Sequence, residues 1–524
     1  MAILIKNATI IDGTAAERKK ADILIEDNRI KKIGELGKKA DKVIDAGGLF
    51  AAPGFIDVNN DSDHYLTLWR DPNQESFLYQ GVTTAIGGNC GASLAPLVKG
   101  DIINSVSKWT DVSDININWQ TVSEFFDNLE RRGLGLNFGT LAGHTTMRRG
   151  ILKDDVRELT PDEILKMRFL LDSALAEGAL GMSVGLAYSH AKITPKEELD
   201  DLARIVKDHD AVFAVHLRGE GEEILPAVKE AIDIAQESKV RLEISHFKIS
   251  GKENWPDLTA AFKMIDEARA KGLDINFDVY PYIQSASVLY IVFPDWVTRG
   301  GRKITLENLK DDIVRKKVIE ELKEKRQEIS GLKIAASRHN IYVGKTIKEI
   351  AKNQGVEPEE AAVNLYLVND GRVIVFWSNI SEENLQKEIG HPASFIGSNG
   401  AGYNLDKKTF KELIHPRCFG AFPRFLDYAV KEKRILNWEE AINKITGGPA
   451  KKFSLTNRGL LKENYFADIV IFDPEKIGEK ATFENPFRYA EGVEYLLING
   501  AEVVEKGKYS GKMAGRILKR VSGI

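Results

Sequence analysis

Three residues of types that bind zinc stand at the carboxyl ends of short apolar runs: Cys90, His216 and His246. A thiolate and two imidazoles form a good set of zinc ligands, and three protein ligands with an open fourth position are typical of catalytic zinc. A lone cysteine is usually a small buried apolar residue, and a lone histidine at a strand end is usually a satisfied polar group. Together, at the ends of different predicted strands, the three favour a metal site.

A dense polar cluster, Asp57 to His64, follows the turn Pro53-Gly54 and a short apolar run, and it includes Asn59 and Asp61. A buried strand has this pattern when its carboxyl end opens into a site. Other polar residues at the ends of predicted strands are Asn89, His144, Asp278 and Asn399. Because the carboxyl ends of parallel barrel strands converge on one face, we expect these side chains to meet there.

The middle of the chain alternates strand and helix patterns, which implies a parallel sheet and an α/β fold class. We predict a (β/α)8 TIM-like barrel. The strand candidates are 55–60, 82–87, 136–142, 178–184, 211–216, 240–245, 273–278, 372–377 and 394–398. A closed eight-stranded barrel uses one fewer, so 372–377 is assigned to the edge of an insertion. The clearest helix has Thr160 as its N-cap, Pro161 at its first position, and Glu163 to complete a capping box.

Both chain ends are rich in short β-branched runs, so residues 1–52 and 447–524 are predicted to form one small β-sandwich domain. Residues 53–446 then form the metal-dependent barrel domain. Within it, the segment at about 283–345 is rich in charge and breaks the alternation, which indicates an inserted subdomain. A lid over the site and a solvated structural insertion are both open interpretations of this segment.

Composition narrows the class of protein. The 524 residues suffice for one large barrel and a smaller domain. A net charge of −4 and a pI near 6.2 give no indication of a nucleic-acid or acidic-surface partner. Two cysteines, Cys90 and Cys418, are too few for a disulfide framework, so a reducing cytoplasm is expected. No apolar run approaches the roughly 20 residues that span a bilayer, so no membrane partner is expected either.

The stretch at 53–57, Pro-Gly-Phe-Ile-Asp, resembles the first barrel strand of the amidohydrolase superfamily. Further motifs narrow the resemblance to the N-acyl-D-amino-acid deacylases (D-aminoacylases). They are Gly88-Asn89-Cys90-Gly91, Gly143-His144-Thr145-Thr146, His216-Leu217-Arg218, Ser245-His246-Phe247-Lys248, Asp278-Val279-Tyr280-Pro281-Tyr282, Gly397-Ser398-Asn399-Gly400 and His415-Pro416-Arg417. The resemblance covers nearly the whole chain and is weakest over 283–370. It implies a zinc-dependent hydrolase of a linear amide bond in a small N-acyl amino acid.

The resemblance also implies roles for individual residues. Cys90, His216 and His246 match the family's tight zinc site, so one zinc ion is expected. The residues that match the region holding the substrate's carboxylate are Lys248, Tyr280, Tyr282 and Arg417, and His144 is added as a further substrate contact. An arginine offers a fork that suits a carboxylate, and a lysine offers a point charge.

Three positions depart from the family's pattern. Asn59 and Asp61 stand where the family has two histidine ligands; Asp61 can still serve as a ligand, whereas Asn59 is a poor one, which leaves at most a partial second site. Asn399 stands where the family has its catalytic aspartate, and a neutral carboxamide cannot take a proton from water. The carboxylates that could replace it by position are Asp61, Asp63, Glu220 and Asp278. We choose Asp61, because it lies where a ligand belongs.

Three functions are open at this point. The first is an N-acyl-D-amino-acid deacylase-like hydrolase with one zinc ion and Asp61 as its base. The second is a pseudoenzyme that binds an N-acyl amino acid or peptide without chemistry. The third is an amidohydrolase acting on a cyclic amide or ureide, against which the motifs with Lys248 and Arg417 argue. Hydrolysis of an N-acyl-D-amino acid by zinc-loaded protein would separate the first two.

Overall fold

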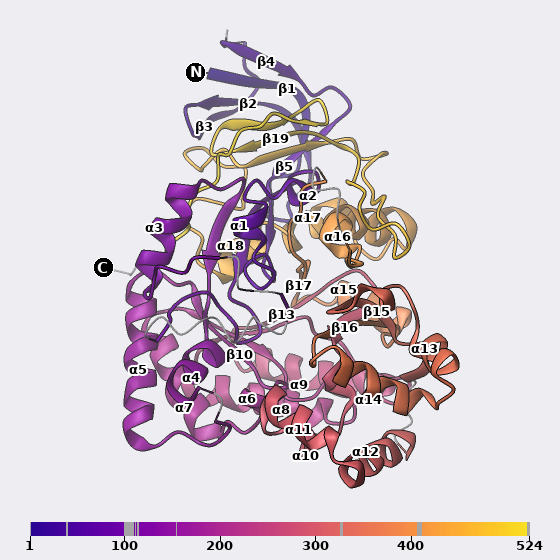
Figure 1. Ribbon diagram of the computed structural model, residues 1–524. Coiled ribbons are helices and arrows are strands. Elements are labelled where there is room, and N and C mark those ends of the chain that lie inside the picture. Colours follow the sequence, from indigo (N-terminus) through magenta and orange to yellow (C-terminus); the bar gives the residue numbers. More distant parts are fainter. Residues whose placement is uncertain are drawn as a thin grey trace.

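The computed structural model describes residues 2–37, 40–98, 109–110, 112, 115–153, 155–324, 329–405 and 411–520. The other residues, which all fall within the ranges predicted above, lie outside the described part of the chain: Met1, 38–39, 99–108, 111, 113–114, 154, 325–328, 406–410 and 521–524. In Figure 1 a sheet built from the chain ends lies at the top, the barrel lies below it, and an inserted subdomain lies at the lower right. This arrangement leaves one end of the barrel facing the insertion.

Parallel strands form the barrel: β6 (Phe55–Asp57), β7 (Val82–Gly87), β8 (Asn137–Thr140), β9 (Ala142–Gly143), β10 (Gly181–Gly185), β11 (Val212–His216), β12 (Arg241–Ile244), β13 (Ile275–Val279) and β17 (Ser394–Ile396). They pair in the orders β6-β7-β8 and β9-β10-β11-β12-β13-β17. Between β8 and β9, the N–H of Leu141 bonds to the Gly87 carbonyl at 2.9 Å, so β8 and β9 occupy one strand position. A parallel bridge between Asn60 and Gly400 joins the first strand to the last. The predicted (β/α)8 barrel fold is confirmed.

Helices cover the outside of the barrel, which is why its strands are buried along nearly their whole length. They are α1 (Thr67–Arg70), α2 (Glu75–Leu78), α3 (Val122–Arg132), α4 (His144–Leu152), α5 (Pro161–Ala176), α6 (Ser189–Lys192), α7 (Lys196–Asp208), α8 (Ile224–Ser238), α9 (Leu258–Ala270), α15 (Glu382–Gly390), α16 (Arg417–Leu426), α17 (Trp438–Lys444) and α18 (Gly447–Lys452). The start of α5 has the predicted capping box: the Thr160 hydroxyl accepts the Glu163 N–H, and the Glu163 carboxylate accepts the Thr160 N–H.

Strands from both chain ends form one nine-stranded sheet. The strands are β1 (Ala2–Ile10), β2 (Lys19–Glu26), β3 (Arg29–Gly34), β4 (Lys42–Asp45), β5 (Phe50–Pro53), β18 (Ile469–Phe472), β19 (Val493–Ile498), β20 (Ala501–Glu505) and β21 (Lys508–Tyr509). The two ends meet where β5 pairs antiparallel with β18. Since β5 runs directly into β6, this sheet also fixes where the first barrel strand begins.

A three-stranded antiparallel sheet, ordered β14-β16-β15, forms the insertion with its own helices. The elements are β14 (Ser285–Val288), α10 (Asp295–Thr298), α11 (Gly301–Lys310), α12 (Asp312–Glu324), β15 (Lys333–Ser337), α13 (Ile347–Gln354), α14 (Pro358–Val368) and β16 (Val373–Trp377). The candidate strand 372–377 therefore belongs to the insertion, but as its central strand rather than its edge. Its buried apolar run resembles a barrel strand because the insertion packs around a hydrophobic core of its own.

None of the helices in the described part of the chain is both long enough and apolar enough to cross a membrane.

Candidate active site

A cavity opens at the carboxyl ends of the barrel strands. Its lining includes the residues Asp61, Cys90, His216, Glu220, His246, Lys248, Tyr280, Asn399 and Arg417. These come from the ends of β6, β7, β11, β12, β13 and β17 and from the first residue of α16. Side chains far apart in sequence thus meet at the face where parallel barrels place their sites.

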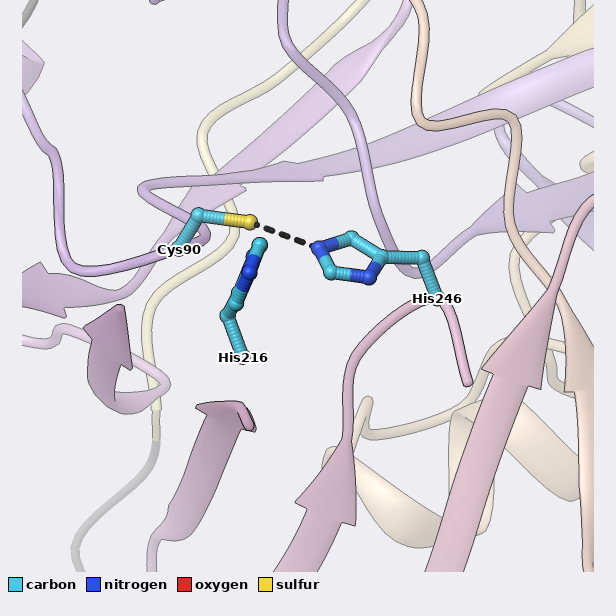
Figure 2. Close-up of side chains that lie close together, drawn as sticks. All are labelled: Cys90, His216 and His246. Atoms are coloured by element: carbon cyan, nitrogen blue, oxygen red, sulfur yellow. Dashed lines mark hydrogen bonds between the residues drawn. The ribbon is translucent and has the colours of Figure 1, made fainter. Parts of the chain in front are cut away.

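Tight turns present two of the predicted metal ligands. Cys90 and His246 both have left-handed backbone, with φ of 52° and 37°, a conformation that costs a non-glycine residue on the order of 1–3 kcal/mol. Next to Cys90, Gly91 has φ 76°, and a Cβ there would lie 2.7 Å from the Gly185 nitrogen. The turn after β7 therefore needs glycine, and it directs the Cys90 thiol toward the His246 ring (Figure 2).

The three predicted ligands form one compact cluster (Figure 2). Cys90 Sγ lies 3.2 Å from His246 Nε2, and one ligand atom from each of Cys90, His216 and His246 lies within 4.8 Å of the others. Two ligands of one tetrahedral zinc, bound at ~2.3 Å through sulfur and ~2.1 Å through nitrogen, stand about 3.6 Å apart. The buried cluster therefore has ligand types and a spacing that suit a metal ion such as zinc. Among the described residues no other group of His, Cys, Asp and Glu forms such a cluster.

Glu220, in the loop after β11, contacts the far side of the His246 ring. Its Oε1 lies 3.2 Å from His246 Nδ1, so the Nδ1 proton faces the carboxylate and Nε2 keeps its lone pair for the cluster. Burial lowers the pKa of His246, and the charge of Lys248 adds to this effect, so the ring is neutral as a metal ligand must be. Burial opposes ionisation of Glu220, but Lys248 and His216 outweigh it and hold its pKa well below the ordinary value.

Two cations line the cavity and differ in their pairing. Lys248 Nζ donates to Glu220 Oε1, which neutralises much of the lysine charge. Arg417 is buried, its guanidinium lies 4.9 Å from the centre of the Tyr280 ring, and no carboxylate of the described residues pairs with it. Neither Arg417 Nε nor Tyr280 Oη has a hydrogen-bond partner within the described protein. An arginine fork beside an unpaired hydroxyl suits an anionic, planar group such as a carboxylate.

Asp61 lies between a histidine and an amide. His64 Nδ1 is 3.1 Å from Asp61 Oδ1. On the other side, in the orientation that satisfies all its neighbours, the Asn399 amide nitrogen donates to Asp61 Oδ2 at 3.1 Å and its oxygen accepts from Arg417 at 3.2 Å. Burial alone would lower the pKa of His64, but Asp63 and Asp61 outweigh it and raise the pKa to about 9. His64 is therefore a cation at neutral pH, and its charge lies beside the Asp61 carboxyl.

Asn59 is used inside the barrel rather than as a ligand. Its Nδ2 donates to both carboxylate oxygens of Asp278, at 3.1 and 3.3 Å. Burial raises the pKa of Asp278 to about 7. A metal ion needs acceptor atoms; at position 59 the donor faces Asp278, while Asn59 Oδ1 and Asp61 Oδ1 have no hydrogen-bond partner among the described residues. Because an amide oxygen is a poor zinc ligand, these positions suit a second metal ion less well than Cys90, His216 and His246 suit the first.

Two predicted substrate contacts lie elsewhere. His144 is fully buried at the start of α4, and its Nε2 lies 2.8 Å from Glu198 on α7. Tyr282 is buried with its hydroxyl donating to Glu479 at 2.7 Å. Neither residue lines the cavity. In both residues a neighbouring carboxylate contacts one polar atom, and their roles as substrate contacts stay predictions.

Of the four carboxylates predicted as possible general bases, two line the cavity and two do not. Asp61 and Glu220 line the cavity, whereas Asp63 and Asp278 do not. Asp63 accepts the Gly88 N–H at 2.7 Å and holds the turn before Cys90. The contact of Glu220 with His246 and that of His64 with Asp61 were not predicted from the sequence. An acid three residues before a histidine, as in 61–64, was the available indication for the second.

Comparison with known proteins agrees with this geometry. The model of the amidohydrolase family matches residues 42–341 and 414–504. The D-aminoacylase of Alcaligenes xylosoxydans xylosoxydans is 31% identical, over 99% of this chain and 98% of its own. The N-acyl-D-glutamate deacylase of Bordetella bronchiseptica, solved with zinc and a phosphonate mimic of the tetrahedral intermediate, is 29% identical with a TM-score of 0.84 over 99% of both chains.

A further structure bears on the metal. It is of a D-aminoacylase, solved to examine the role of its binuclear metal centre, and it describes activation by one metal and attenuation by the second. It is 30% identical to this chain, with a TM-score of 0.83 over 99% of both chains. Together these matches span the barrel, the terminal sheet and the insertion. The chain therefore belongs to the amidohydrolase family and, within it, to the D-aminoacylase (N-acyl-D-amino-acid deacylase) group of metal-dependent enzymes that act on C–N bonds.

Proposed function

We propose that this protein hydrolyses the linear amide bond of N-acyl-D-amino acids with a single zinc ion held by Cys90, His216 and His246. The observation that carries the proposal is the common cavity: the three-ligand cluster opens into the same space as a buried arginine without a carboxylate partner. A metal ion held by the cluster would act on the amide, and the arginine would bind the substrate's carboxylate. The one-metal activation described for a D-aminoacylase supports a single ion.

Zinc in such a site supplies Lewis acidity, which makes water nucleophilic at neutral pH and polarises an amide carbonyl. The protein's part is to hold the ligands and to place the substrate. Glu220 fixes the tautomer and the ring plane of His246, a contact that raises the basicity of a ligating imidazole. Lys248 in turn holds Glu220 ionised.

Arg417 and Tyr280 bind the substrate's carboxylate in this proposal. Arg417 stacks on Tyr280 and donates to Asn399 from one terminal nitrogen, so its Nε has no partner and no acid neutralises its charge, and the Tyr280 hydroxyl adds a donor on the same wall. Lys248 faces the cavity as well, but its charge is committed to Glu220. We therefore assign Lys248 to support of the metal ligands rather than to the substrate.

Asp61 acts as the general base. Of the carboxylates considered, it lines the cavity, lies 3.1 Å from His64 Nδ1, and has no lysine partner among the described residues. It takes a proton from the attacking water and returns it to the leaving nitrogen, a role that contributes about 10²- to 10⁴-fold in typical enzymes. Asn399 cannot do this, since its amide has no basic lone pair of this kind.

The domain division is also a proposal. We assign 1–52 and 447–524 to the terminal sheet domain, 53–446 to the barrel, and the segment near 283–345 to a lid. The pairing of β5 with β18 supports the first. Ser285, Tyr290 and Trp377 of the insertion line the cavity, which favours a lid over a purely structural insertion.

The test is hydrolysis by protein purified without chelator, with N-acetyl-D- and N-acetyl-L-amino acids offered side by side. We expect turnover of D enantiomers that is lost with a chelator and restored by one equivalent of zinc. Zinc-loaded protein that binds these compounds without hydrolysing them would support the pseudoenzyme. Faster turnover of a hydantoin than of any N-acyl amino acid would support action on a cyclic ureide, for which Arg417 has no carboxylate to bind.

A further inference from the structure

Four side chains form a continuous polar chain across the mouth of the barrel. It runs from His64 to Asp61, from Asp61 to Asn399, and from Asn399 to Arg417, with contacts of 3.1, 3.1 and 3.2 Å. His64 comes from the segment after β6, Asn399 from the end of β17 and Arg417 from the start of α16. The backbone joins the same elements, because the Asn399 N–H bonds to the Asn59 carbonyl and the Asp61 N–H to the Gly400 carbonyl, both at 2.7 Å.

Each link of this chain has a fixed direction. Arg417 can only donate, so the Asn399 oxygen must face it and the Asn399 nitrogen must face Asp61. A carboxylate oxygen accepts, so Asp61 Oδ2 accepts from the Asn399 amide, while Asp61 Oδ1 lies 3.1 Å from His64 Nδ1 as a close ion-pair contact without hydrogen-bond geometry. His64 is itself held on its other side, where Nε2 lies 2.9 Å from the Ala92 carbonyl. An aspartate at 399 would place two carboxylates about 3 Å apart, and like charges at that distance do not both ionise.

We propose that Asn399 and His64 are positioning residues for the Asp61 carboxylate, and that the Asn399 amide couples this base to Arg417 and so to the substrate's carboxylate. The inference rests on the function proposed above. It makes Asn399 a required residue, because its amide is the one neutral group of this shape that can donate to Asp61 and accept from Arg417 at once. Asn399 also has left-handed backbone, φ 47°, which asparagine tolerates better than most residues.

The reciprocal exchange tests the direction of the chain. Asn399→Asp alone opposes two carboxylates, so kcat should fall by about 10²-fold or more, and the melting temperature should fall as well. Asp61→Asn alone removes the carboxylate and should lower kcat while leaving KM near the wild-type value. The double variant Asp61→Asn with Asn399→Asp restores a donor facing an acceptor at every link, so it should regain the melting temperature lost in Asn399→Asp and recover part of kcat.

A second pair of variants examines His64. Asparagine at 64 retains a donor near the place of Nδ1, whereas leucine does not. His64→Asn should therefore keep more of kcat than His64→Leu at similar KM, and both should keep one zinc per chain. If His64→Leu fails to fold, the comparison of His64→Asn with wild type still applies: a kcat equal to that of wild type, although the imidazole beside Asp61 is gone, would overturn this part of the proposal.

The outcomes separate this inference from the proposed function. If zinc-loaded wild type hydrolyses no N-acyl amino acid, the proposed function fails, and the recovery of melting temperature in the exchange still decides whether the four residues are coupled as described. If wild type is active and Asn399→Asp equals or exceeds it in kcat and melting temperature, the inference is wrong and the proposed function stands. Independent, additive effects of the two exchanges on melting temperature would likewise overturn the coupling.

Discussion

The mouth of the barrel has two halves that are built differently. At the ends of β7, β11 and β12, the three proposed metal ligands come together as a compact cluster, namely Cys90, His216 and His246. At the ends of β6 and β17, Asn59 and Asn399 donate hydrogen bonds to carboxylates where the family has groups that bind metal or take a proton. In the proposal made here, one half of the site keeps its metal ligands while the other half is a network of hydrogen bonds.

The half of the barrel mouth that contains Cys90, His216 and His246 is called the metal half below. Replacing one of these three proposed ligands should lower activity more than any other substitution. Cys90→Ala should lose bound zinc and lower kcat/KM by about 10³-fold or more, because Lewis acidity contributes several kcal/mol. Zinc content by mass spectrometry and hydrolysis of an N-acetyl-D-amino acid measure this. Cys418→Ala is the matched control, since Cys418 is also buried but lies outside the cluster. Full zinc content in Cys90→Ala would contradict the assignment of the metal half.

Replacing Arg417, the proposed contact of the substrate's carboxylate, should have the second largest effect on activity. Arg417→Lys keeps the charge but loses the fork, and hydrogen bonds to charged groups contribute about 1.5–3 kcal/mol, so KM should rise about 10- to 150-fold. Arg424→Lys is the control, because Arg424 lies on the same helix but pairs with Glu479. An N-acyl amine without a carboxylate should be insensitive to Arg417→Lys. Equal losses on both compounds would mean that Arg417 does not bind the carboxylate.

Replacing Glu220, the carboxylate that contacts His246, should weaken the binding of zinc. Glu220→Gln preserves shape but weakens the contact with His246 Nδ1, so zinc affinity should fall about 10- to 100-fold. Competition with a fluorescent chelator measures the affinity. Glu230→Gln, which alters an acid paired with Arg218, should leave it unchanged. A Glu220→Gln protein that binds zinc as tightly as wild type would remove Glu220 from the metal half.

Replacing Asp278, the carboxylate that accepts hydrogen bonds from Asn59, should change the stability of the protein but not its zinc content. Burial raises the pKa of Asp278 to about 7, against the opposing influence of Asn59 and Lys248 and with the help of Asp57. The folded protein therefore keeps a proton that the unfolded chain releases near pH 4, and this makes the free energy of unfolding fall as the pH rises from about 4 to 7. Asp278→Asn should flatten that slope in denaturant titrations and leave zinc content unchanged. A slope unaltered by the substitution would contradict the buried, protonated carboxyl.

The sequence predicted the metal half better than the other half. Cys90, His216 and His246 each follow an apolar run. In a parallel barrel the carboxyl ends of all strands lie on one face, and this alone is enough to bring the three residues together. The partners of Asn59, Asp61 and Asn399 could not be predicted in this way, because they depend on which donor faces which acceptor across the barrel. His144 and Tyr282 show the same limit: each lies in a motif at the barrel rim, but the sequence does not show that Glu198 and Glu479 contact their polar atoms.

The fold, too, could be predicted from the sequence only in part. The barrel strands and the start of α5 follow from local patterns, namely apolar runs and the Thr160 capping box. The insertion is harder, since β16 is a buried apolar strand that no local pattern distinguishes from a barrel strand. Its place in the insertion depends on antiparallel pairing with β14 and β15, which are distant in sequence.

Anomalous scattering at the zinc absorption edge, from crystals grown with excess zinc, compares the two halves most directly. The account predicts one peak per chain, among Cys90 Sγ, His216 and His246 Nε2, with the hydrogen bonds from Asn59 to Asp278 and from Asn399 to Asp61 intact. A second peak of similar height beside Asp61 and Asp278 would contradict it, because the β6–β17 half would then still be a metal site.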